Sequence, residues 1–187
     1  MYPIITRSVP VQLGRRIAKP SLTLTLRTVV ANNGSKRWAS SVNSLTKTQL
    51  PFTYSPNGPK IVKYTKDHEW IAAHEDGIAF IGISKYASDS LGDATYIELP
   101  EVDTIIEEGE SMGSVESVKS ASEIYQPVKG EVVEVNTELE NKPQLINQDP
   151  MGLGWIAKIK LDSMNDIDSS DKLLSLDQYE ESLKHDD

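Results

Sequence analysis

The charges of this 187-residue chain are divided sharply along its length. Residues 1–66 carry 11 Lys or Arg and no Asp or Glu, whereas residues 67–187 carry 8 basic and all 28 acidic residues. A basic, acid-free N-terminus that is rich in Ser and Thr is typical of a mitochondrial transit peptide. A basic arm for nucleic acid or membrane has a similar composition, but this segment offers few aromatic residues to stack on bases. We therefore predict import into the mitochondrial matrix.

Charge and turn residues together divide the chain into three parts. Residues 1–47 are predicted to be the transit peptide and its cleavage region, because the sequence from Arg37 to Ser40 resembles a processing site. The mature chain would then start between about residue 39 and residue 48. Residues 48–62 contain Pro and Gly and are expected to form an extended lead-in. Residues 63–187 form the folded, acidic domain, which suits docking onto basic surfaces of partner proteins.

Short β-type runs separated by turn residues follow one another through the folded domain. Strands are expected over residues 70–73, 78–83, 94–99, 111–118, 124–128, 130–136 and 155–161. Asp76-Gly77 predicts a hairpin turn, and Ser84 and Gly92 predict the two ends of a helix over residues 85–91. Near the C-terminus, an apolar pattern at helical spacing is formed by Leu173, Leu176, Tyr179 and Leu183. The prediction is an all-β dominated fold with minor α, including a C-terminal helix.

The chain offers little of the chemistry of an enzyme. It contains no cysteine, which excludes thiolate catalysis, disulfides and zinc–thiolate sites. His68, His74 and His185 do not have the spacing of a zinc site and are expected to be structural or surface residues. No catalytic residue and no metal site is predicted, and a free-standing hydrolase is disfavoured because no nucleophile–base pair is found. The chain is interpreted as a carrier or binding module.

One lysine lies in an unusual context. Lys119 is the only basic residue between Lys85 and Lys129, and it lies between two expected strands. This position predicts the tip of a hairpin, where the ε-amine is within reach of a modifying enzyme and becomes a long swinging arm once it is acylated. The alternative interpretation is an ordinary surface lysine.

Around Lys119 the sequence resembles the H-protein family of the glycine cleavage system, whose members carry a lipoyl group. The resemblance covers residues 61–184. It is carried by YTKDHEW at 64–70, GIS at 82–84, IELP at 97–100, GSVESVKS at 113–120, PVKGEV at 127–132, PQLIN at 143–147 and GWIAKI at 154–159. It implies a barrel-sandwich hybrid of two small antiparallel sheets, with lipoate attached covalently to Lys119. Biotin carriers share this architecture but flank their lysine with Met, whereas Val118 and Ser120 favour lipoate.

The resemblance also implies a set of partner proteins. A pyridoxal-phosphate glycine decarboxylase would load the arm with an aminomethyl group, and an aminomethyltransferase would pass that group to tetrahydrofolate. A flavin-dependent dihydrolipoyl dehydrogenase would reoxidise the arm, and a lipoyl or octanoyl transferase would attach it. The partners supply the chemistry, and the chain is expected to be a monomer that binds neither nucleic acid nor membrane. Two alternatives stay open: a lipoate relay that supplies 2-oxo acid dehydrogenase complexes, and a generic lipoyl domain.

The resemblance assigns five further residues around the arm. Glu69, Asp67 and Glu123 would accept hydrogen bonds from the amine of the loaded arm, in a cleft whose exclusion of water slows hydrolysis. Only Glu69 matches the family directly, because Ser and Asp are expected at the other two positions. Glu116 and Gly113 are interpreted as recognition residues for the lipoylating enzyme. The alternative interpretation treats the four acids as ordinary solvated carboxylates and Gly113 as structural.

Overall fold

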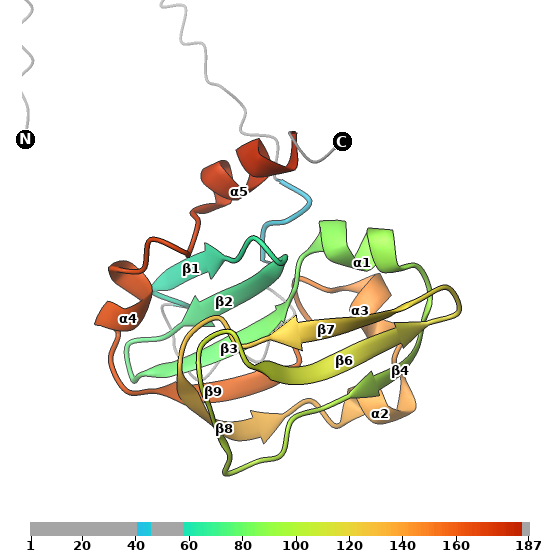
Figure 1. The fold of residues 1–187 in the computed structure, drawn as a ribbon, viewed down its shortest axis with the longest axis horizontal. Helices are drawn as coiled ribbons and strands as arrows, with labels where there is room; N and C mark the ends of the chain where they lie inside the picture. Colours follow the sequence, from blue (N-terminus) through green and yellow to red (C-terminus); the bar gives the residue numbers. More distant parts are fainter. Residues whose placement is uncertain (1–40, 46–57, 185–187) are drawn as a thin grey trace, which may run out of the picture. The chain divides into compact units, whose positions relative to one another are not determined.

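The computed structural model describes residues 41–45 and 58–184, and these residues form two antiparallel sheets with short helices (Figure 1). The strands are β1 (Ile61–Tyr64), β2 (Glu69–Ala73), β3 (Ile78–Ile83), β4 (Ala94–Glu98), β5 (Ile105–Ile106), β6 (Ser111–Ser117), β7 (Ala121–Tyr125), β8 (Gly130–Val135) and β9 (Ala157–Leu161). The helices are α1 (Lys85–Leu91), α2 (Glu138–Asn141), α3 (Leu145–Gln148), α4 (Asn165–Asp168) and α5 (Leu176–Leu183). None of these helices is long and apolar enough to span a membrane.

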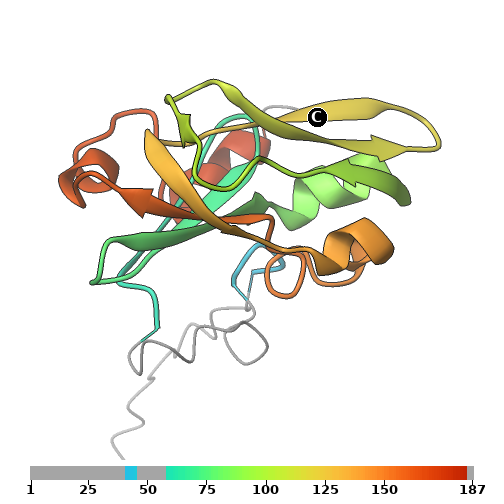
Figure 2. The ribbon, with the colours of Figure 1, turned by 90° about the horizontal axis from the view of Figure 1, so that it is seen from below.

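The two sheets differ in size and pack in layers. One sheet has six strands in the order β1-β2-β3-β9-β8-β5, and the other has three in the order β4-β6-β7. Figure 2 shows the three-stranded sheet lying over the larger one. One hydrophobic cluster joins Ile71 and Ile81 of the larger sheet to Ile97, Val115 and Ile124 of the smaller one. This cluster therefore forms the core between the layers.

A second hydrophobic cluster includes Tyr64, Trp70, Phe80, Trp155 and Tyr179. Strands β2 and β3 contribute to both clusters, which explains why β2 is buried along its whole length. Strands covered on both faces lose the alternation of apolar and polar residues and read as continuous apolar runs. The second cluster binds the C-terminal helix α5 to β1, because the Tyr64 and Tyr179 rings stack with centroids 4.9 Å apart.

Several expected elements are confirmed. Helix α1 has the predicted bounds, and the Ser84 side chain accepts a hydrogen bond from the Ala87 N–H at 3.1 Å. Gly92 ends the helix with φ of 80°, and Gly77 has φ of 82° in the turn between β2 and β3. Both angles lie in the left-handed region, which glycine enters without a steric penalty.

One strand prediction was displaced and several short elements were missed. Strand β7 runs over Ala121–Tyr125 instead of 124–128, because the hairpin turn closes at Ser120 and leaves the next residues free to pair. Helices α2, α3 and α4 have four residues each. One turn of helix is too short to show a 3.6-residue period. Residues 1–40 and 46–47 of the predicted transit peptide and cleavage region, and residues 48–57 of the lead-in, lie outside the described residues.

Candidate functional site

Strands β6 and β7 form a hairpin (Figure 1). Lys119 lies in its turn, where the sequence predicts it. Glu116 pairs with Ala121, and the Ser117 N–H donates to the Ser120 carbonyl at 2.8 Å. Val118 and Lys119 occupy the centre of this turn, and both are exposed. Lys119 forms no salt bridge with any residue in the described ranges. The amine is therefore presented to solvent at the end of a two-stranded hairpin.

Ser117 shapes this turn, and the sequence analysis gave it no role of its own. Its Oγ accepts hydrogen bonds from the Lys119 and Ser120 N–H groups, both at 3.1 Å, and donates to the Ser120 carbonyl at 3.1 Å. Serine side chains often bond to backbone groups two or three residues ahead in turns. That tendency is the local signal that could have identified Ser117.

We expect Ser117→Ala to slow lipoyl attachment several-fold while lowering the free energy of unfolding by only about 1 kcal/mol. The turn would remain, but its backbone would sample more conformations around Lys119. The initial rate of attachment by a lipoyl transferase measures the effect. Ser163→Ala is the matched control, because Ser163 Oγ also accepts a turn N–H, that of Asn165 at 3.1 Å, in another part of the fold. Equal rates for the two variants would contradict the role of Ser117.

The Lys119 side chain lies over the C-terminal end of α1. A Cβ atom placed on Gly92 would lie 3.3 Å from the Lys119 Nζ and 3.5 Å from its Cε. Gly92 therefore leaves room for the lysine stem on this side of the hairpin. The stem and α1 meet at the entrance of a cleft.

This cleft has a volume of about 210 Å³ and runs between β7, α1 and the loop before β2. Its apolar lining includes Ile83, Leu91, Val115 and Ile124. The polar residues that line it are Asp67, His68, Glu69, Ser90, Ser120, Ser122 and Glu123. The cleft thus begins beside Lys119, at Ser120, and brings together all three acids that the family resemblance assigns to the loaded arm.

Glu69 is the buried acid of the cleft, with 1% of its surface exposed. Its Oε1 accepts a hydrogen bond from the Tyr125 N–H at 3.0 Å, and its Oε2 accepts one from the Thr65 hydroxyl. Burial raises the pKa of the Glu69 carboxyl above its ordinary value, and the charge of Asp67 adds to this rise, whereas the bonds from Thr65 and Tyr125 oppose it. A carboxylate that is poorly solvated in this way gains most from a cationic partner.

Asp67 and Glu123 differ from Glu69 in being exposed. Asp67 lies in the loop that the Thr65 N–H closes by donating to the Glu69 carbonyl at 2.9 Å. The Glu123 carboxylate accepts a hydrogen bond from Ser111 on the neighbouring strand. Glu123 therefore borders the cleft with its carboxylate already hydrogen-bonded to Ser111. The roles of Asp67 and Glu123 toward the arm stay predictions.

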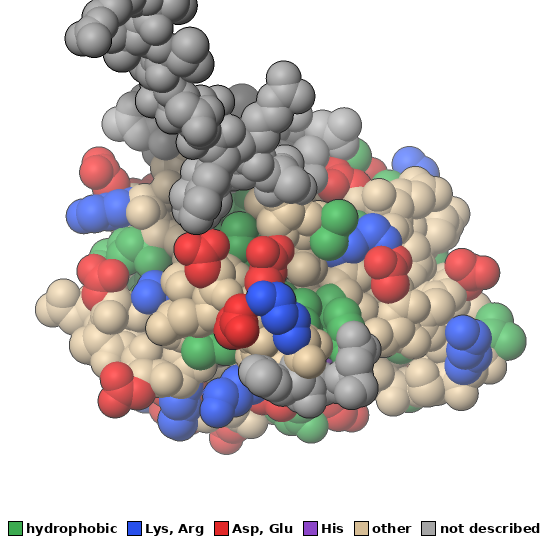
Figure 3. Space-filling view, turned by 90° about the horizontal axis from the view of Figure 1, so that it is seen from above, with side chains coloured by type: hydrophobic (Ala, Val, Ile, Leu, Met, Phe, Trp, Pro, Cys, Tyr) green, Lys and Arg blue, Asp and Glu red, His purple; other side chains and the backbone are tan. Residues whose placement is uncertain are grey.

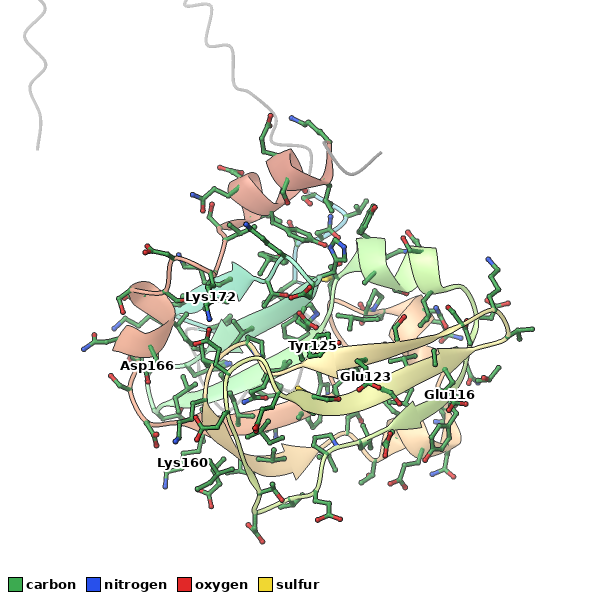
Figure 4. All side chains as sticks on the ribbon, viewed as in Figure 1. Glu116, Glu123, Tyr125, Lys160, Asp166 and Lys172 are labelled. Carbon is green, nitrogen blue, oxygen red and sulfur yellow. The ribbon has the colours of Figure 1, made fainter. Side chains whose placement is uncertain are left out.

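The two predicted recognition residues occupy different environments on β6. Glu116 is exposed and pairs with Tyr96 and Ala121, and Figure 4 shows it nearer the hairpin tip than Glu123 or Tyr125. A Cβ atom on Gly113 would lie 2.2 Å from the Glu98 carbonyl oxygen. Gly113 is thus required for the close pairing of β4 and β6. Recognition by a lipoylating enzyme stays a prediction for both residues.

A second cavity, of about 320 Å³, adjoins the cleft. It shares Asp67 and Glu69 with the cleft and is otherwise lined by residues such as Tyr125, Gln126 and Lys172. No residue of the hairpin turn lines it. An arm attached to Lys119 would therefore enter the smaller cleft first.

We also searched the described residues for metal-ligand clusters and for patches of surface charge. In residues 41–45 and 58–184, no cluster of three or more His, Asp or Glu side chains is arranged to hold a metal ion. On the face seen in Figure 3, acidic and basic side chains are interspersed over the described surface. The excess of acidic residues is thus not gathered into one continuous patch on this face.

Known proteins resemble this chain closely. The glycine cleavage H-protein family matches residues 62–186. The mitochondrial glycine cleavage system H protein of Saccharomyces cerevisiae is 60% identical over 148 residues, which are 79% of this chain and 87% of the yeast protein. The glycine cleavage system H protein of Thermus thermophilus is 52% identical over 126 residues, which are 67% of this chain and 95% of that protein.

A solved structure resembles the fold as well. The crystal structure of a glycine cleavage system H protein from Mycobacterium marinum aligns with a TM-score of 0.60 and 35% identity, and it covers 67% of this chain and 98% of that one. These similarities confirm the family resemblance and the fold class predicted from the sequence.

Proposed function

The chain belongs to the glycine cleavage H-protein family, and we propose that it is a lipoyl carrier of the glycine cleavage system, modified on Lys119. The observation that carries this proposal is the continuity of the site. An exposed lysine at a hairpin tip adjoins a cleft that ends at a buried carboxylate. A carrier needs such a site, because its arm must be reachable by enzymes and sheltered between visits.

The dimensions of the site support this use. An extended lysine with its lipoyl chain spans roughly 14 Å on standard bond lengths, and a strand rises about 3.3 Å per residue. The arm is therefore about as long as four residues of a strand, so from the turn at Lys119 it can extend along the first residues of β7, which begins at Ala121. Apolar residues Leu91, Val115 and Ile124 line the cleft along this path and suit an aliphatic chain.

The lining of the cleft is also suited to protecting a labile cargo. When attached, lipoate supplies a disulfide that can take up and release an aminomethyl group. The apolar lining would keep water away from that group, and Glu69 would accept a hydrogen bond from its amine. Because Glu69 is already desolvated, a cationic amine meets an acceptor whose charge is weakly screened by water. The chain itself supplies position and shelter and leaves bond-making to its partners.

The proposed partners follow from the family. They are a pyridoxal-phosphate glycine decarboxylase, a tetrahydrofolate-dependent aminomethyltransferase, a flavin dihydrolipoyl dehydrogenase and a lipoyl or octanoyl transferase. We place this exchange in the mitochondrial matrix, because the yeast relative is named as mitochondrial and the N-terminus is basic and acid-free. The excess of acidic residues beyond residue 66 favours docking onto basic surfaces of those enzymes.

Mass mapping of the native protein tests the proposal. The protein is purified from cells that synthesise lipoate, and its peptides are examined for the added mass of a lipoyl group. We expect the added mass on the peptide that contains Lys119 and on no other lysine peptide. A protein from lipoate-replete cells whose Lys119 peptide is always unmodified would overturn the carrier function.

A further inference from the structure

Residues 41–45 pack against the folded domain, although the sequence predicts a transit peptide and cleavage region through residue 47. Asn43 is buried with 3% of its surface exposed, whereas its neighbour Val42 is 73% exposed. Leu45 packs against the hydrophobic cluster that contains Tyr64 and Tyr179. In Figure 1 this segment is the blue stretch beside α5. We refer to residues 41–45 as the N-terminal strap.

Asn43 satisfies two polar groups of the domain. Its Oδ1 accepts a hydrogen bond from the Tyr86 N–H at 3.2 Å. Tyr86 lies in the first turn of α1, where N–H groups have no partner inside the helix, and Ser84 covers only the Ala87 N–H. The Asn43 carbonyl accepts a hydrogen bond from the Tyr64 hydroxyl at 2.6 Å. Tyr64 is itself 1% exposed.

The strap also reaches the C-terminal helix, because the Ser41 hydroxyl donates to Glu180. It therefore connects β1, α1 and α5. Helix α1 contributes Ala87, Ser90 and Leu91 to the cleft beside the lysine hairpin. The strap, which accepts a hydrogen bond from the first turn of α1, thus stabilises the helix that forms one side of the cleft.

We infer that the chain from Ser41 onward remains in the mature protein, so that the leader is removed N-terminal to Ser41. This inference rests on the mitochondrial import included in the proposed function. Removal of Asn43 would leave the buried Tyr64 hydroxyl without its acceptor and uncover a first-turn N–H of α1. Buried polar groups that lose their partners destabilise a fold strongly. The window for the mature N-terminus, residues 39–48 from sequence, narrows to residues 39–41.

The N-terminus of the protein purified from mitochondria tests the inference directly. We expect intact mass and N-terminal sequencing to show a first residue between Ala39 and Ser41. A first residue at Val42 or beyond overturns it, and so does a full-length chain that starts at Met1. The lipoyl mass separates the two proposals. A correctly trimmed chain without the adduct contradicts the carrier function alone, and an adduct on an untrimmed or over-trimmed chain contradicts the processing inference alone.

Substitutions in the strap test its structural contribution in the same imported protein. We expect Asn43→Ala to lower the melting temperature by about 5 °C or more, because it removes the acceptor of the Tyr86 N–H in a buried position. Val42→Ala is the matched control and should change it by about 1 °C or less, since Val42 faces solvent. Equal melting temperatures for the Asn43→Ala and Val42→Ala proteins would show that the strap does not stabilise the fold and would remove the physical ground of the inference.

Discussion

Replacement of Lys119 by arginine is expected to remove the lipoyl group completely and to reduce glycine cleavage by the reconstituted enzymes to the level measured without this protein. Arginine preserves the charge and the length of the side chain. Its guanidinium stays protonated and is not an acceptor for an acyl group. Because Lys119 is exposed at the tip of the hairpin and forms no salt bridge among the described residues, the substitution should leave the fold unchanged. Intact mass, melting temperature and glycine-dependent release of carbon dioxide are the three measurements.

Lys129→Arg is the matched control for this experiment. Lys129 is also exposed, lies in the turn after β7, and pairs with Glu107 at 2.5 Å. An arginine there would retain the ion pair, and we expect full lipoylation and full activity. If the Lys119→Arg protein kept the adduct, or if it supported glycine cleavage without an adduct, the assignment of the arm to Lys119 would be wrong.

The lysine at the centre of this experiment could be located from sequence alone, because the signals around it are local. The Asp76-Gly77 turn and the Ser84 and Gly92 ends of α1 involve backbone conformations that depend on a few neighbouring residues. Lys119 was placed correctly at a hairpin tip for a similar reason, since β-type runs flank it on both sides. Interactions between residues close in the chain therefore predicted much of the fold.

Long-range contacts were the part that sequence could not supply. Tyr179 was expected only as an apolar position on the C-terminal helix, but its hydroxyl lies 2.9 Å from the His68 Nδ1 and 2.7 Å from the Ser84 Oγ. It thus links α5 to the loop that carries Asp67 and Glu69. His68 and Tyr179 are 111 residues apart in the sequence, and no local sequence pattern predicts their contact.

The sequence predicts neither the packing of the N-terminal strap nor the burial of Glu69, for two different reasons. The composition of residues 1–66 is uniform enough that Asn43 reads as part of a leader. Glu69 sits at the start of a strand, and polar residues at strand ends are ordinarily solvated. Its burial depends on β7, whose Tyr125 N–H reaches it across the sheet boundary. The family resemblance predicts that Glu69 belongs to the site, but only the structure shows that it is buried.

Glu69→Gln is expected to shorten the lifetime of the loaded arm about 10- to 100-fold. Glutamine has the same shape and can still accept the Tyr125 N–H, but it lacks the charge that would hold the amine of the arm. Hydrogen bonds to charged groups contribute roughly 1.5–3 kcal/mol, which corresponds to this range of rates. Release of ammonia from the loaded protein, measured without the aminomethyltransferase, gives the lifetime. Glu140→Gln, an exposed position on α2, is the control and should not change it.

The same substitution should stabilise the unloaded protein at neutral pH, by about 1 kcal/mol. The ordinary pKa of a Glu carboxyl is 4.5, and folding raises the pKa of Glu69 above this value. At a pH above the raised pKa, the buried carboxylate is ionised and lowers the stability of the folded state. As the pH falls toward 4.5, the folded state takes up the proton first and this penalty disappears. The difference in melting temperature between Glu69→Gln and the parent protein should therefore be largest at pH 7–8 and shrink on acidification. A variant that is less stable at neutral pH, or one whose loaded arm lives as long as the parent's, would show that Glu69 serves the fold and not the cargo.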